Sequence, residues 1–72
     1  MTNQTDDGVI NRVEYRGYVI NIGGTSEGYW YRVNLNGTIA ENIGVCVGVH
    51  RALIDGKSAI DFYLATGRVA GR

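Results

Sequence analysis

The stretch GYWYRVNLNGTIAE, residues 28–41, decides the fold. From residue 29 to residue 35 apolar side chains alternate with polar ones or with Trp30, as in a strand with one buried face. Asn36-Gly37 follows this run. Asn-Gly between two apolar runs is the strongest short signal for a hairpin, because both turn residues need positive φ. We therefore expect antiparallel strands over 29–35 and 38–43.

The Asn-Gly turn also sets how the two strands pair. The expected partners are Leu35 with Thr38, Val33 with Ala40, and Arg32 with Glu41. The last pair joins opposite charges, and such a cross-strand pair contributes roughly 0.2–1 kcal/mol. Its sign supports this register.

A further strand is expected before this hairpin, over residues 12–22, because that segment is rich in β-branched and aromatic residues. Gly17 interrupts it and indicates a bulge or kink. Ile22 is then expected opposite Tyr29, which leaves residues 23–28 as a glycine-rich hairpin loop. The loop lacks the Gly-Lys-Ser/Thr ending and the following helix of a phosphate-binding loop, so we expect no phosphate site there.

The C-terminal part is predicted to be a helix. Apolar residues recur at helical spacing from Ala52 to Leu64, and Gly67 is placed to cap the C-terminal end. Gly56 lies on the apolar stripe and would let the helix approach the sheet closely. In the alternative, Asp55-Gly56 forms a turn and Ser58, with Asp61, caps a shorter helix. Residues 44–49 either extend the third strand or form an apolar crossover.

These elements predict an α+β fold with an antiparallel meander of three strands, or of four if residues 44–49 contribute one. One C-terminal helix packs on one face of the sheet. We expect residues 1–8 to be a disordered tail, residues 9–67 a single domain, and residues 68–72 a flexible tail.

Composition excludes several classes of protein. The 72 residues carry seven basic and seven acidic side chains, and this balance disfavours nonspecific binding to nucleic acid. One cysteine and one histidine can form neither an intrachain disulfide nor a four-ligand zinc site, so we expect no metal and no cofactor. The N-terminus resembles no signal peptide, and no apolar run reaches the ~20 residues of a membrane span. We therefore expect a cytoplasmic protein that binds no membrane.

The sequence offers little for catalysis. Cys46 and His50 are four residues apart, which would place them on one face if both were helical. Cys46, however, lies in an apolar run, and a lone buried cysteine is usually a small hydrophobic residue. No two carboxylates are placed to shift each other's pKa as acid–base catalysis requires. We expect no enzyme.

The candidate interaction face is the side of the sheet that the helix leaves open. Tryptophan and arginine are enriched at the centres of protein interfaces, and a small domain gains stability from a partner. We expect a homodimer or a complex with another protein, formed through this face or the edge of the third strand. An aromatic beside a base can also stack nucleobases, so a single-stranded nucleic-acid binder is the alternative, and a small enzyme is a third. The candidate interaction residues are Val19, Trp30, Arg32, Ile39 and Ile43 on the sheet, with Phe62, which lies off the core stripe of the helix, as a second anchor.

One segment resembles a known family. VHRALIDGKSAIDFYL, residues 49–64, is similar to the helix of HicB-type antitoxin N-terminal domains, with its Ala-Leu pair, small polar stretch and aromatic-Leu end. Gly28-Tyr29 resembles the start of their second strand, and the likeness covers about residues 15 to 65. The family's Gly-Asp-Thr-x-Glu-Glu-Ala helix entry is absent, since residues 47–51 read VGVHR. The resemblance implies a small, dimeric, partner-binding domain of bacterial or phage origin.

Overall fold

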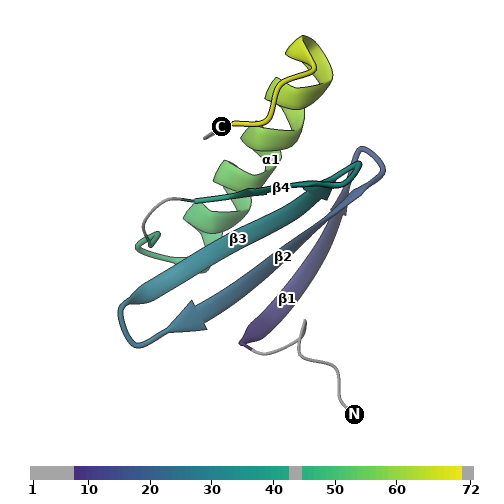
Figure 1. The fold of residues 1–72 in the computed structure, drawn as a ribbon. Coiled ribbons are helices and arrows are strands. Elements are labelled where there is room, and N and C mark those ends of the chain that lie inside the picture. The colour runs from purple at the N-terminus through teal and green to yellow at the C-terminus, as the bar shows by residue number, and fades with distance from the viewer. Residues whose placement is uncertain (1–7, 43–44, 71–72) are drawn as a thin grey trace.

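A computed structural model describes residues 8–42 and 45–70. They form one antiparallel sheet in the order β1-β2-β3-β4, and one helix that packs on a face of this sheet (Figure 1). The predicted α+β meander with one C-terminal helix is confirmed, with four strands. The elements are β1 Val9–Tyr15, β2 Tyr18–Thr25, β3 Gly28–Leu35, β4 Thr38–Glu41 and α1 Val49–Thr66.

The fourth strand comes from the N-terminal segment, so the expected single strand over 12–22 is wrong. This segment is a hairpin in which β1 and β2 pair across Arg16-Gly17. The φ angles of these two residues are 54° and 88°, and two successive positive φ angles match the tight turn that suits the twist of a hairpin. Gly17 is therefore a turn residue and not a bulge. Arginine is unusual at the first turn position, which hides this turn in the sequence.

The Asn36-Gly37 hairpin is confirmed. Its φ angles are 55° and 104°, and Asn34 Oδ1 accepts a hydrogen bond of 2.7 Å from the N–H of Gly37. β4 ends at Glu41, and Ile43 lies outside the described residues. The pairs Leu35–Thr38, Val33–Ala40 and Arg32–Glu41 are all present.

The glycine-rich stretch is part of a strand, which corrects the predicted pairing of Ile22 with Tyr29. Ile22 pairs with Tyr31, and β2 continues through Gly23 and Gly24 to Thr25. Residues 26–27 alone connect β2 to β3. The longer β2 is possible because Gly23 has no side chain: a Cβ there would overlap the indole ring of Trp30, which pairs with it.

The segment before the helix crosses back to the start of β3. Cys46 forms a single antiparallel bridge with Tyr29, through backbone N–H to O distances of 2.7 and 3.0 Å. Residues 43–44 lie outside the described part of the chain. Within residues 45–49, the bridge at Cys46 is the contact of the kind that paired strands make. The segment is thus a crossover that leads to Gly48, the N-cap of α1.

The helix is continuous through Gly56, which settles the choice left open by the sequence. Gly56 is buried, and a Cβ on it would lie 2.7 Å from Ile20 Cγ2 in β2. Gly67 ends the helix as predicted, with a φ of 75° and an N–H that donates to the Tyr63 carbonyl at 2.7 Å. The close approach at Gly56 therefore brings the helix backbone onto the sheet.

The core lies between α1 and the face of the sheet predicted to be apolar. Its fully buried large side chains come from β2, β3 and α1: Ile20, Ile22, Val33, Leu35 and Ile60. Beyond the helix the chain turns back toward the sheet (Figure 1), and Val69 and Ala70 are half-buried against this core. Sequence analysis placed these two residues in a flexible tail.

Candidate functional site

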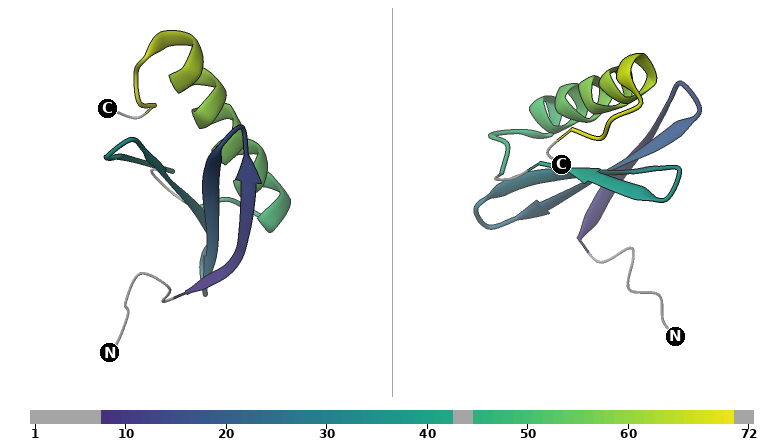
Figure 2. Two further views of the ribbon diagram at one scale, coloured as in Figure 1. Left: turned by 90° about the vertical axis from the view of Figure 1, so that its right-hand side faces the viewer. Right: turned by 45° about the horizontal axis from the view of Figure 1, so that its top comes forward.

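The site is the face of the sheet opposite α1. Strand alternation turns Trp30, Arg32 and Asn34 away from the buried side chains of β3. No helix within residues 8–42 and 45–70 covers this face, as two further views make clear (Figure 2). The open face therefore presents an aromatic, a cation and amides together.

Trp30 is held in place from two sides. Its ring lies against Gly23, and a Cβ on Gly8 would be 3.7 Å from its Cζ2 atom. The Arg32 guanidinium lies 4.8 Å from the ring centroid, in the range of a cation–π contact, which contributes about 0.5–1 kcal/mol at an exposed site. Arg32 Nε also donates to Glu41 Oε1 at 3.2 Å. The half-buried indole is thus held by its neighbours on the sheet.

Four of the six predicted residues share this face and one does not. Val19, with 46% of its surface exposed, and the half-buried Ile39 lie on the same side of the sheet as Trp30 and Arg32. Phe62 is on α1, where it lines an open groove with Tyr31 and Asp55 on the covered side of the sheet. Phe62 is exposed on the helix and apart from the sheet face, while Ile43 lies outside the described residues.

Strand alternation in the sequence already places Asn21 and Asn34 on this face, but the candidate residues did not include them. An open hollow of about 410 Å³ lies next to Val19, and its lining includes Asn21, Asn34 and Asn36. The corrected register changes the cross-strand neighbour of Asn21 and places it opposite Arg32. Amides beside an aromatic and an arginine can hydrogen-bond and pack against a polypeptide surface.

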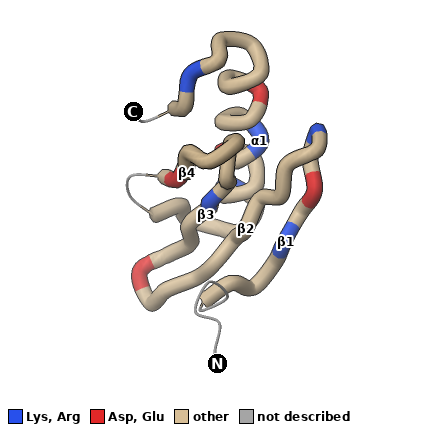
Figure 3. Tube along the Cα trace, turned by 45° about the vertical axis from the view of Figure 1, so that its right-hand side comes forward, with Lys and Arg blue, Asp and Glu red and all other residues tan. Residues whose placement is uncertain are grey.

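The open face carries charges of both signs. The register of the sheet aligns Arg12, Asn21, Arg32 and Glu41 in one row, and Glu14 follows Arg12 by two positions in β1. Figure 3 shows basic and acidic positions interspersed along these strands. A phosphate backbone is bound by a surplus of cations, and this face presents a balance instead.

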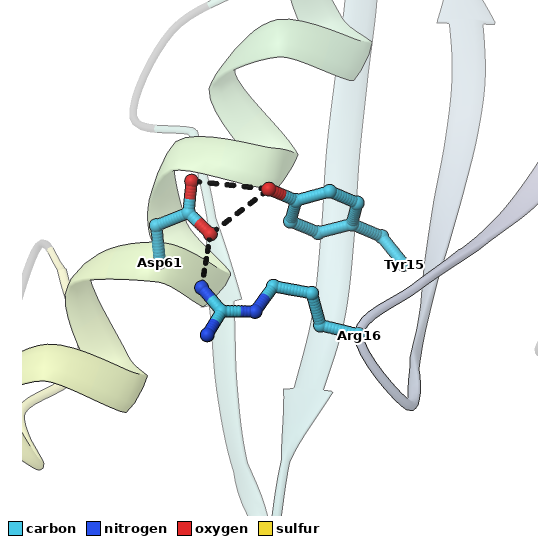
Figure 4. Close-up of polar contacts among 3 residues, drawn as sticks. All are labelled: Tyr15, Arg16 and Asp61. Carbon is cyan, nitrogen blue, oxygen red and sulfur yellow. Dashed lines mark hydrogen bonds and ion pairs between the residues drawn. The ribbon is translucent and has the colours of Figure 1, made fainter.

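A second polar cluster joins the β1–β2 turn to the helix (Figure 4). Tyr15 Oη donates to the two carboxylate oxygens of Asp61 at 3.0 and 3.2 Å, and Arg16 Nη1 lies 2.8 Å from Asp61 Oδ1. The Arg16 hydrogen bond is the main cause of a lowered Asp61 pKa, and the bond to Asp61 is the main cause of a raised Tyr15 pKa. Lys57 Nζ lies 5.3 Å from the Tyr15 ring centroid. These contacts dock the turn on the helix.

Cys46 does not form the imagined pair with His50. It precedes the helix cap at Gly48, so the two residues share no helical face. The thiol is buried, and its Sγ lies 3.5 Å from Asp55 Oδ2, to which it donates. Burial and then this hydrogen bond raise the pKa of Cys46, which favours the unreactive thiol.

Within residues 8–42 and 45–70, no group of three or more His, Cys, Asp or Glu side chains is placed to hold a metal ion. The helix that the structure describes is not apolar enough over its length to cross a membrane.

Comparison with known proteins gives no relative. No family model matches the chain, and no curated protein or solved structure is significantly similar to it. The resemblance to HicB-type antitoxin N-terminal domains therefore stays a prediction from the sequence.

Proposed function

We propose that the protein is a noncatalytic interaction module, works as a homodimer, and binds a protein partner through the open face around Trp30. The observation that carries the proposal is the fixed position of this ring, which lies on Gly23 with Arg32 stacked against it. A rigid aromatic loses little conformational entropy on binding, so such residues dominate the free energy of protein association.

The surroundings of Trp30 favour a reversible protein interface. Reversible interfaces are about as polar as the rest of a protein surface, with aromatic and arginine side chains enriched at their centre. The open face combines Trp30 and Arg32 with the amides of Asn21 and Asn34 and the aliphatic Val19. The raised Cys46 pKa supports the noncatalytic part of the proposal, because it suppresses the thiolate that a nucleophilic enzyme would use.

The proposal is tested by crosslinking followed by binding. A photoreactive residue at Val19 should capture a partner in the native host, while one at Leu64, equally exposed on α1, should not. The captured protein, once purified, should bind Trp30→Ala at least about tenfold more weakly than wild type, because loss of a central aromatic costs ~2 kcal/mol or more. Leu64→Ala is the matched control and should bind like wild type.

Equal affinity for wild type and Trp30→Ala, with both folded by circular dichroism, would contradict the proposal. If Trp30→Ala does not fold, Val19→Asp places a charge on the same face without removing the ring. Titration of single-stranded oligonucleotides at low and high salt tests the alternative. Salt-sensitive binding that Trp30→Ala abolishes would replace the protein partner with nucleic acid.

A further inference from the structure

β1 forms one edge of the sheet, and its regular part has a clear centre. Among the described residues no strand pairs with its outer side, because the strand order is β1-β2-β3-β4. The pairing with β2 is irregular between Val9 and Asn11, and the strand ends at Tyr15 before the turn. The regular stretch from residue 11 to residue 15 is therefore centred on Val13.

The backbone groups that point outward on this stretch belong to Arg12 and Glu14. Tyr15 and Tyr18 close a two-residue turn, so they form a hydrogen-bonded pair, and the pairs alternate along an antiparallel ladder from there. The alternation turns the N–H and C=O groups of Arg12 and Glu14 away from β2. In agreement, the Arg12 N–H donates to its neighbour Asn11 Oδ1 at 2.9 Å.

The side chains of Arg12 and Glu14 make this edge complementary to itself. Both are exposed on the open face, and they carry opposite charges (Figure 3). In an antiparallel pair of two β1 strands, the outward N–H and C=O groups of one strand must lie opposite the outward groups of the other. Centred on Val13, each Arg12 lies opposite the partner's Glu14. In a register centred on Arg12, the two Arg12 side chains lie opposite each other, and in one centred on Glu14 the two Glu14 side chains do. Like charges in this position are destabilising.

We propose that β1 pairs with β1 of a second copy, antiparallel and in the two-fold register centred on Val13. This rests on the proposed homodimer and names its interface. An axis normal to the sheet joins the two four-stranded sheets into one and keeps both helices on the same side. The two Trp30 surfaces then form one continuous open face on the other side.

The opposite edge is less suited to a second copy. β4 has four residues, and the same alternation turns the backbone groups of Ile39 and Glu41 outward. Antiparallel pairing of β4 with itself would place Ile39 opposite the partner's Glu41, two glutamates opposite each other, or two Ile39 side chains opposite each other, and none of these registers pairs opposite charges. On β1, the charge-paired register moves the Arg12 N–H from Asn11 Oδ1 to the carbonyl of the partner's Glu14.

The test is a charge exchange followed by sedimentation. Wild type should dimerise, with an affinity that falls as salt screens the ion pairs. Arg12→Glu and Glu14→Arg should each weaken the dimer by at least about tenfold, because attractive cross-strand pairs become repulsive. The double variant should dimerise again, and an equimolar mixture of the two single variants should form a heterodimer. Circular dichroism verifies that each exposed substitution leaves the fold intact.

A second measurement does not depend on charge. Residues opposite each other in a pair without hydrogen bonds have Cα atoms about 4.5 Å apart, which suits a disulfide. Val13→Cys should therefore oxidise rapidly to a covalent dimer, and Val9→Cys should not. A wild-type dimer that both single charge variants retain would overturn the β1 pairing and leave the homodimer standing. A wild type that stays monomeric at high micromolar concentration would overturn both.

Discussion

Gly56 is the residue at which α1 comes closest to the sheet. An alanine there would favour the helix by up to about 1 kcal/mol. Its Cβ would, however, lie 2.7 Å from Cγ2 of Ile20, whose branched side chain is fully buried. Overpacking of this kind costs about 1–3 kcal/mol. We expect Gly56→Ala to lower the free energy of unfolding by about 1–2 kcal/mol in urea denaturation.

Ser58→Ala is the matched control for this substitution. It is exposed on the same helix, so it gains helix propensity without meeting the sheet. Its free energy of unfolding should not fall. A stabilised Gly56→Ala would show that the helix can move away from Ile20 at little cost.

Cys46 should resist thiol reagents in the folded protein. Its burial and its hydrogen bond to Asp55 raise its pKa, so little thiolate is present near pH 8. Alkylation of the native protein at that pH should be at least about tenfold slower than alkylation in denaturant. Equal rates in the two conditions would contradict the buried position and reopen the question of a nucleophile.

At the scale of elements, Asp61 joins the β1–β2 turn to α1. The turn is held at a positive φ on Arg16, and Asp61 accepts hydrogen bonds from both Arg16 and Tyr15. The β1–β2 turn and α1 are far apart in the sequence, so this long-range contact closes a loop that contains most of the chain. The same contact makes the stability of the protein depend on pH.

We expect Asp61 to stabilise the fold at neutral pH and to lose this effect in acid. Its pKa is lower in the folded state than in the unfolded chain, where it is about 3.9, so the contribution is complete above that value and disappears as the pH falls through the folded pKa. The raised pKa of Tyr15 has the opposite sign: its contribution is present below about pH 10 and disappears as the pH rises through the folded value.

Urea denaturation at pH 3, 7 and 10.5 measures both effects. Asp61→Asn should reduce the loss of stability between pH 7 and pH 3, and Tyr15→Phe should keep most of it, because Arg16 still pairs with Asp61. Tyr15→Phe should instead reduce the loss between pH 7 and pH 10.5. If Asp61→Asn loses as much stability between pH 7 and pH 3 as wild type does, then the ion pair, whose two side chains are half-exposed, contributes nothing measurable to stability.

At the scale of the whole molecule, the proposed homodimer would add to the stability that a small core provides. A domain of this size buries only about 60% of the surface that its unfolded chain exposes. If the folded form is a dimer, unfolding is coupled to dissociation. The thermal midpoint should rise by on the order of 5 °C over a hundredfold increase in protein concentration, and Arg12→Glu should remove this dependence. A midpoint that is independent of concentration in wild type would contradict the homodimer.

Much of the fold could be predicted from local patterns. Asn36-Gly37 is a pair typical of a tight hairpin turn with positive φ at both residues. The alternation of β3 separates the buried Val33 and Leu35 from the open Trp30 and Arg32. The candidate face was therefore identified on its central strand. β1 was not recognised as a separate strand because Arg16-Gly17 is not a typical turn pair, and Arg12 and Glu14 were missed with it.

The sequence by itself determined the two features that depend on backbone conformation and side-chain period: the second hairpin and the apolar face that α1 covers. Only the tertiary structure decided the register of β2 and the depth at which the helix packs. Both depend on glycines, because the absence of a side chain leaves space for a residue that is distant in the sequence. Gly23 makes room for the ring of Trp30, and Gly56 makes room for Ile20. The position of Gly56 on the apolar stripe predicts a close approach, but the residue that fills each space is decided only when two segments far apart in the chain come into contact.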